Sequence, residues 1–145
     1  MKRVLFINGP NLNLLGTREP AVYGRQTLAD IESRVRARAD SLACSVDFRQ
    51  SNSEGEIVGW LQGAAATHDA VVLNPAGFTH YSQAIGDAVA GSRLPIYEVH
   101  LSNVHAREPW RRKSVVSPGA AGVIAGLGAI GYELALEAAV GSRRV

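Results

Sequence analysis

The sequence predicts an α/β protein in which a parallel sheet is covered by helices on both faces. Apolar runs alternate with helical patterns along the chain, and repeated strand–helix units of this length imply parallel strands joined by crossover helices. Residues 70–73 form an uninterrupted apolar run, which is typical of a strand buried on both faces. With 145 residues, of which 46% are hydrophobic, we expect one domain spanning residues 1–145.

Turn and capping signals divide this alternation into elements. Thr27 with Asp30, and Ser53 with Glu56, place an acidic residue three positions after a hydroxyl, as at the start of a helix. The expected strands are Arg3–Asn8, Cys44–Gln50, Ala70–Asn74, Leu94–Val99 and Ser114–Val116. The expected helices begin near Thr27 and Ser53 and span about Ser82–Ala90 and Ala120–Val140. Five such strands suit the flavodoxin-like, doubly wound order 2-1-3-4-5.

Charge and composition exclude several classes of protein. The formal net charge is only +2, from 15 basic and 13 acidic residues, which argues against binding nucleic acid through bulk charge. The basic residues do gather at Arg107 and at positions 111–113, which favours a small anionic ligand. A single cysteine, Cys44, excludes an internal disulfide framework. We find no signal peptide and no apolar run of about 18 residues, so we expect a cytoplasmic protein without a membrane span.

Three polar segments follow the expected strands and should meet in one cleft. In this type of sheet, ligands bind beyond the carboxyl ends of the strands, beside strand 1. The segments are the long loop Asn8–Gly24, the turn at residues 74–77 and the turn at residues 100–103. The cleft is therefore expected to hold Asn11, Arg18, Tyr23, Asn74, His80, His100, Ser102, Arg107 and Arg111.

Two residue pairs in this cleft suggest acid–base chemistry. Arg18 lies close in sequence to Tyr23, and a nearby positive charge favours a phenolate that can act as a base. Glu98 and His100 are two residues apart on a strand and so share a face, where the carboxylate can orient the imidazole and keep it protonated. The alternatives are that Tyr23 only packs the loop down and that Glu98 and His100 only satisfy each other.

The other histidines and Asp87 have weaker signals. His100 and His105 are five residues apart with no third ligand at a recognisable spacing, so no metal site is expected. His80 is either a residue of the cleft or a cap of the helix that follows. His68 is expected to be solvated or to interact with a helix dipole. Asp87 lies on the third expected helix, away from the cleft, and on its own would be interpreted as a surface charge.

Residues 126–131 match the dinucleotide-binding pattern G-x-G-x-x-G. That fingerprint also needs an acidic residue at the end of a second strand about 20 positions later, and no such strand follows in this sequence. We therefore place these glycines on the last helix, where they would allow close approach of a neighbouring element. A flavodoxin-like module for FMN or another nucleotide stays an alternative, but it needs a phosphate-binding loop after strand 1, and residues 9–24 contain one threonine and two prolines.

Taken together, four segments resemble the type II 3-dehydroquinate dehydratases. They are NGPNLNLLGTREPAVYG at residues 8–24, NPAGFTH at 74–80, EVHLSNVHARE at 98–108 and GVIAGLGAIGYELAL at 122–136. The resemblance covers nearly the whole chain in the right order. It implies a flavodoxin-like enzyme without cofactor or metal that removes water from 3-dehydroquinate by anti elimination through an enolate. The product is 3-dehydroshikimate, in the shikimate pathway or in quinate catabolism, and the expected assembly is a homododecamer.

The resemblance also implies roles for the catalytic residues named above. Tyr23 matches the base that takes a proton from the carbon next to the ketone, and Arg18 matches the arginine that holds this tyrosine as phenolate. Asn11 matches a group that stabilises the enolate through water. His100 matches the acid that protonates the departing hydroxyl, and Glu98 orients it.

The substrate-binding positions follow from the same resemblance. They are Asn74, His80, the backbone of Leu101 and Ser102, Arg111, Arg107 on the mobile loop, and Asp87, which the family supplies from an adjacent subunit. The sequence departs from the family pattern at Tyr81, where a small hydroxyl residue is usual, and at Lys113 and Val115, where histidine and tyrosine are common. A catalytically silent relative is a further alternative, against which the intact Tyr23, Arg18 and His100 argue.

Overall fold

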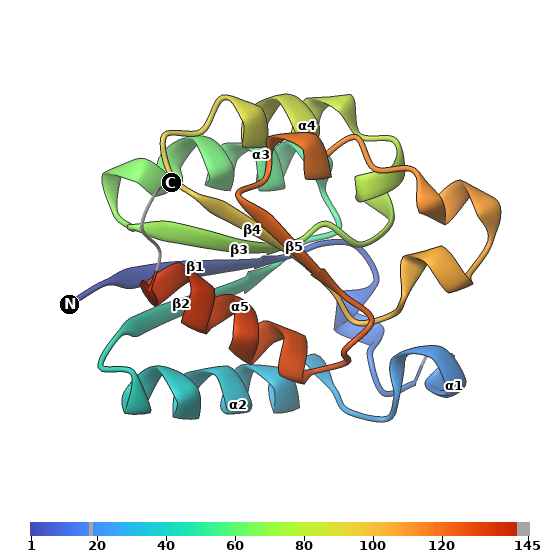
Figure 1. Cartoon of the computed structure of the whole chain (residues 1–145), viewed down its shortest axis with the longest axis horizontal. Coiled ribbons are helices and arrows are strands. Elements are labelled where there is room, and N and C mark those ends of the chain that lie inside the picture. Colours follow the sequence, from blue (N-terminus) through green and yellow to red (C-terminus); the bar gives the residue numbers. More distant parts are fainter. Residues whose placement is uncertain (18, 142–145) are drawn as a thin grey trace.

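A computed structural model describes residues 1–17 and 19–141. Its centre is a single five-stranded parallel sheet with the order β2-β1-β3-β4-β5, which confirms the predicted fold class and strand order (Figure 1). The strands are β1 (Arg3–Asn8), β2 (Ser45–Gln50), β3 (Ala70–Asn74), β4 (Ile96–His100) and β5 (Gly122–Ala125).

Helices cover both faces of this sheet. They are α1 (Pro20–Tyr23), α2 (Leu28–Ser41), α3 (Glu54–Gly63), α4 (Gln83–Ala90) and α5 (Ile130–Gly141). Figure 1 shows α2 and α5 on one face, α3 and α4 on the other, and α1 beyond one end of the strands. Two apolar clusters fill the two spaces between the helices and the sheet, and β1 and β3 contribute alternate side chains to each.

The parallel register brings the carboxyl ends of the strands to one edge of the sheet. Asn8, the last residue of β1, pairs with Asn74, the last residue of β3. Leu73 pairs with Glu98, and His100 at the end of β4 pairs with Ala125. The polar residues that follow β1, β3 and β4 therefore lie close together, although they are far apart in sequence.

The predicted starts of α2, α3 and α4 are confirmed, because the hydroxyl caps form. Thr27 and Asp30 make both hydrogen bonds of a capping box, at 3.1 and 3.0 Å. The Ser53 hydroxyl accepts the backbone N–H of Glu56, and Ser82 caps α4 in the same way. These signals are local, which is why the sequence was sufficient to locate them.

The prediction of a fifth strand at Ser114–Val116 was wrong. The strand lies at Gly122–Ala125, where it pairs with β4. The Ser114 hydroxyl instead accepts the backbone N–H groups of Val116 and Ser117, and such a turn competes with extended pairing. The backbone N–H of Val115 donates to the Thr79 carbonyl at 2.8 Å, which ties this segment to the turn after β3.

The predicted last helix, Ala120–Val140, was too long at its start. Helix α5 begins at Ile130, after β5 and a tight turn. Gly126 and Gly128 have φ angles of +87° and +67°, so they form this strand-to-helix turn and do not lie on a helix. Only Gly131 of this group lies within α5, where an added Cβ would be 3.3 Å from Ile124 and 3.4 Å from Val99.

The long loop after β1 contains short helices at Leu12–Leu14 and Pro20–Tyr23. Arg18 lies outside the described residues, as does the side chain of Tyr23, whose backbone ends α1.

His68 is buried and hydrogen-bonded, so the expectation of a solvated histidine was wrong. Within the described part of the chain, every helix is too short or too polar to cross a membrane.

Candidate active site

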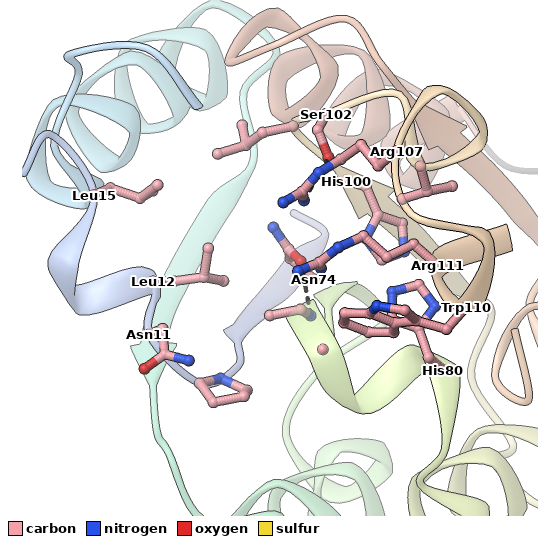
Figure 2. A pocket seen from close by; sticks show the side chains of 15 residues that line it. Asn11, Leu12, Leu15, Asn74, His80, His100, Ser102, Arg107, Trp110 and Arg111 are labelled. Atoms are coloured by element: carbon pink, nitrogen blue, oxygen red, sulfur yellow. Dashed lines mark hydrogen bonds between the residues drawn. The ribbon is translucent and has the colours of Figure 1, made fainter. Parts of the chain in front are cut away.

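A pocket of about 170 Å³ lies beyond the carboxyl ends of β1, β3 and β4 (Figure 2). The loop after β1, the turn after β3 and the segment 100–111 form its walls. Its lining combines amide, imidazole and guanidinium groups with apolar side chains, which together suit a small polar anion. The lining residues are Pro10, Asn11, Leu12, Leu15, Asn74, Ala76, Gly77, His80, His100, Leu101, Ser102, Val104, Arg107, Trp110 and Arg111.

The structure brings together most of the residues that the sequence and the family resemblance proposed for the site. Eight of them line the pocket, namely Asn11, Asn74, His80, His100, Leu101, Ser102, Arg107 and Arg111. Glu98 lies behind His100, outside the lining. Asp87 is instead on a separate groove of about 650 Å³ formed by α3, α4 and the residues that follow them. Arg18 and the Tyr23 side chain lie outside what the structure describes.

His100 and Glu98 form a buried hydrogen-bonded pair. Nε2 of His100 lies 2.5 Å from the Glu98 carboxylate, and because an ionised carboxylate only accepts, Nε2 donates this bond. The bond leaves Nδ1 as the ring nitrogen that can serve a ligand. The same carboxylate accepts the hydroxyls of Thr79 and Ser117, each at 2.6 Å.

These three donors decide the charge of Glu98. Burial alone raises the pKa of this carboxyl, but the hydrogen bonds and the charge of His100 outweigh burial, and the pKa lies below its ordinary value. Glu98 is therefore an anion at neutral pH. Sequence analysis did not find Thr79 or Ser117, because each is about 19 residues from Glu98 and neither is part of a local pattern.

The hydrogen bond of His80 determines which of its ring nitrogens can serve a ligand. Its Nδ1 lies 2.8 Å from the Lys113 carbonyl, and since a carbonyl only accepts, Nδ1 carries the proton. Burial is the main reason that the pKa of His80 lies below its ordinary value, and the positive charge of His100 acts in the same direction. A neutral ring with Nδ1 protonated leaves Nε2 as a hydrogen-bond acceptor for a ligand. Ser82, and not His80, caps α4.

Trp110 holds His80 and Arg111 in place, although sequence analysis did not single it out. Its ring meets the His80 ring edge-on at 5.1 Å between centroids. The Arg111 guanidinium lies 4.1 Å from the Trp110 ring centroid, and its Nε donates to Glu108 at 2.5 Å. An aromatic residue within a basic cluster was the available signal, since Trp110 directly precedes Arg111.

Arg107 connects the pocket to the loop after β1. A guanidinium nitrogen lies 3.5 Å from the Ser102 hydroxyl, and another lies 3.7 Å from the Glu19 carboxylate. Glu19 has a left-handed backbone, with φ of +43°, and immediately precedes α1. Arg107 is therefore in contact with the short helix whose last residue is Tyr23.

Asn11 lies across the pocket from the histidines (Figure 2). It has a left-handed backbone, with φ of +67°, which asparagine tolerates better than most residues. Its backbone N–H donates to Asn52 Oδ1 at 3.0 Å, so this turn is tied to the segment after β2. The arrangement leaves the Asn11 side chain at the pocket wall.

Together these groups can support proton transfer on a small anion. The pocket offers a histidine backed by an anionic carboxylate, a neutral histidine, amide groups and two guanidiniums. No three His, Cys, Asp or Glu side chains of residues 1–17 and 19–141 gather as metal ligands. The groups of the pocket can supply acid–base catalysis together with electrostatic stabilisation of a developing oxyanion.

Comparison with known proteins identifies the family. Residues 2–140 match the family model described as dehydroquinase class II, and the chain belongs to this family of enzymes. The 3-dehydroquinate dehydratase of Desulforudis audaxviator is 56% identical over 138 residues, which cover 95% of this chain and 92% of that protein. The catabolic 3-dehydroquinase 1 of Neosartorya fischeri is 54% identical over 136 residues, covering 94% and 91%.

A solved structure agrees with these matches. The type II dehydroquinase of Propionibacterium acnes superposes with a TM-score of 0.93 at 45% sequence identity. The superposition covers 98% of each chain. The fold and the family are thus established independently of the roles assigned to single residues.

Proposed function

We propose that this chain is a single catalytic domain that dehydrates 3-dehydroquinate to 3-dehydroshikimate. The observation that carries the proposal is the buried His100–Glu98 pair, which faces a small pocket with Arg107 and Arg111 in a chain of the class II dehydroquinase family. The relatives include one named as a dehydratase and one named as a catabolic enzyme. Either biosynthesis or quinate breakdown is compatible with the same chemistry.

The reaction begins with removal of a proton from the carbon next to the ketone. The Tyr23 phenolate takes this proton, Arg18 stabilises the phenolate, and the electron pair moves onto the ketone oxygen to give an enolate. Asn11 donates, through a water molecule, to the negative oxygen. A donor already aimed at a developing oxyanion typically lowers the barrier by about 3–4 kcal/mol, because it needs no reorganisation when the charge forms.

The second step expels the hydroxyl group on the opposite face. The enolate collapses, the carbon–oxygen bond breaks, and His100 gives its proton to the departing oxygen, so water leaves. Glu98 accepts the Nε2–H of His100 and so orients the ring for this transfer. The released imidazole takes a proton from solvent for the next turnover, and the phenol loses its proton.

The remaining pocket residues bind the substrate. Arg111 and the Nε2 acceptor of His80 suit hydroxyl groups, and the Leu101 and Ser102 backbone suits the carboxylate. Arg107 links the substrate to the loop that carries Tyr23, so closure of that loop would exclude water from the enolate. Tyr81, which departs from the family pattern, is largely exposed and packs edge-on against Phe78. It lies outside the pocket lining.

We further propose a cytoplasmic homododecamer in which Asp87 reaches the site of a neighbouring subunit. The supporting observation is that Asp87 lines the groove of α3 and α4 and does not line its own chain's pocket. Sedimentation of the purified protein measures the assembly directly, and a monomer at catalytic concentrations would reject this part of the proposal.

The deciding experiment is absorbance of the conjugated product after 3-dehydroquinate is added to protein without added metal or cofactor. We expect a rise for the wild-type chain and a loss of at least about 10²-fold for Tyr23→Phe, because general-base catalysis contributes on this scale. Tyr97→Phe, which removes a hydroxyl on β4 outside the pocket, is the matched control and should behave as wild type. No rise from folded wild-type protein would favour a silent relative, and near-normal turnover by Tyr23→Phe would reject Tyr23 as the base.

A further inference from the structure

Below the pocket floor, three buried polar side chains from three elements form one hydrogen-bonded chain. Asn8 and Asn74 are the last residues of β1 and β3, and Tyr132 comes from α5. The Tyr132 hydroxyl donates to Asn8 Oδ1 at 2.7 Å, and it accepts from Asn74 Nδ2 at 2.9 Å. All three residues are almost completely buried, and of the three only Asn74 lines the pocket.

The direction of every bond in this chain is determined by backbone groups at its two ends. At one end, Asn8 Nδ2 lies 3.0 Å from the Arg49 carbonyl, which can only accept, so Asn8 Oδ1 must face Tyr132. At the other end, the backbone N–H of Ala76 can only donate, and it donates to Asn74 Oδ1 at 3.0 Å. Both ends therefore require the same orientation of the Asn74 amide.

Tyr132 is suited to hold this orientation. Burial raises the pKa of its phenol well above the ordinary value, so the hydroxyl stays protonated and keeps its donor. The ring packs against Phe6 and Phe48, with centroids 6.1 and 6.4 Å away. The hydroxyl is thus held at a fixed position between the two asparagines.

The Asn74 amide keeps part of its hydrogen-bonding capacity. Its oxygen accepts from Ala76 and one of its two N–H groups donates to Tyr132, so the second N–H and one oxygen lone pair remain, in a fixed orientation. In the view of Figure 2, Asn74 lies at the centre of the pocket lining. The floor of the pocket can therefore donate to a ligand oxygen through the second Asn74 N–H.

We propose that Tyr132 and Asn8 are positioning residues that fix the orientation of the Asn74 amide, so that its second N–H donates to an oxygen of the substrate. The proposal rests on the proposed dehydratase function and assigns part of substrate binding to residues outside the pocket. A buried donor aimed at a substrate oxygen discriminates strongly, because a ligand without that oxygen leaves the N–H unpaired.

A double-mutant cycle tests this inference. Tyr132→Phe keeps the ring and removes the hydroxyl oxygen. We expect KM for 3-dehydroquinate to rise about five- to tenfold and kcat to change less than about threefold, because one hydrogen bond to the substrate is weakened when the Asn74 amide is no longer oriented. In an Asn74→Ala background, which has no amide to orient, the same substitution should change KM less than about twofold. Tyr97→Phe removes a hydroxyl that lies outside the pocket and outside this hydrogen-bonded series, so its effect should be equal in both backgrounds.

Equal effects of Tyr132→Phe in the two backgrounds would overturn the inference and leave Tyr132 a residue of the core. If thermal unfolding shows that Tyr132→Phe is not folded at the assay temperature, Asn8→Ala replaces it. This substitution is combined with Asn74→Ala, removes the other partner of the Tyr132 hydroxyl, and is judged by the same criterion. Wild-type turnover separates the two proposals. If the folded wild-type protein does not convert 3-dehydroquinate, both the dehydratase function and this inference are rejected. If the wild type is active but the effects of the two substitutions on KM are additive, only this inference is rejected.

Discussion

Two histidine–carboxylate pairs lie at opposite ends of this sheet, and only one of them adjoins the pocket. His100 donates to Glu98 at 2.5 Å at the carboxyl end of β4, and His68 lies 2.6 Å from Asp47 just before the amino end of β3. Both histidines are buried, with 7% and 6% of their surface exposed. Distance and burial therefore do not distinguish a candidate catalytic histidine from a structural one.

The ring nitrogens do distinguish them. His68 uses both of its nitrogens within the protein, because Nδ1 lies 2.8 Å from the Thr67 hydroxyl while Nε2 bonds Asp47. His100 uses Nε2 for Glu98 and lines the pocket with the rest of its ring. Both histidines therefore have a carboxylate partner, but only His100 has a ring nitrogen that is not used by that partner and lies beside the pocket.

The largest expected difference comes from removing each histidine in turn. His100→Ala should lower kcat by about 10²–10⁴-fold with little change in the fold, because it removes the general acid. His68→Ala should leave kcat within about twofold but lower the free energy of unfolding by about 1–3 kcal/mol, because it removes two partly buried hydrogen bonds. Steady-state kinetics and urea unfolding of both variants measure this, and comparable losses of kcat would abolish the distinction.

Neutralising the carboxylate partner of each histidine should have a smaller effect on kcat. Glu98→Gln should lower kcat by roughly 10–10²-fold, because the imidazole loses its orientation. Steady-state kinetics measures this loss of kcat. Asp47→Asn is the matched control, and its kcat should equal that of the wild type. A kcat of Glu98→Gln within about twofold of the wild type would show that Glu98 does not act through His100.

The smallest expected effect is on stability in acid. The hydrogen bond from His68, with smaller contributions from its charge and from Arg3, outweighs burial and lowers the pKa of Asp47 below its ordinary value. A lowered folded-state pKa adds stability above the unfolded value, near pH 4, and that stability is lost as the pH falls through the folded value. Because Asp47 is more than a third exposed, screening limits the contribution to about 1 kcal/mol.

Asp47→Asn should therefore be about 1 kcal/mol less stable than the wild type at pH 7, and the difference should shrink as the pH falls below about 4. Urea unfolding at a series of pH values measures it. A difference that stays constant across that range would mean that Asp47 contributes through packing and not through its charge.

Local sequence was sufficient for much of the fold. The Thr27 and Ser53 caps, the apolar run of β3 and the alternation of elements depend on residues that are neighbours in the chain, and the structure confirms them. Parallel strands place their carboxyl ends at one edge of the sheet, and this rule was sufficient to predict that Asn11, Asn74 and His100 meet in one pocket.

Local sequence misled where distant partners compete with local propensity. The valines at 115 and 116 favour a strand, but the Ser114 hydroxyl turn and the Thr79 carbonyl hold that segment elsewhere. The strand β5 contains a glycine and is only partly buried, so its pattern was weaker than that of the helix which the sequence predicted in its place. His68 gave the signal of a solvated histidine, since Asp47 is 21 residues away.

The sequence by itself determined the order of strands and helices, the edge of the sheet where ligands bind, and the types of residue gathered there. Only the tertiary structure decided how those residues are supported. Glu98 is held as an anion by hydroxyls 19 residues away on either side, and Asn74 is oriented by Tyr132 and Asn8, which are 124 residues apart. The physical reason is that periodicity and capping arise between neighbours in the chain, whereas hydrogen bonds in a buried site join groups that meet only after the sheet and its helices have packed.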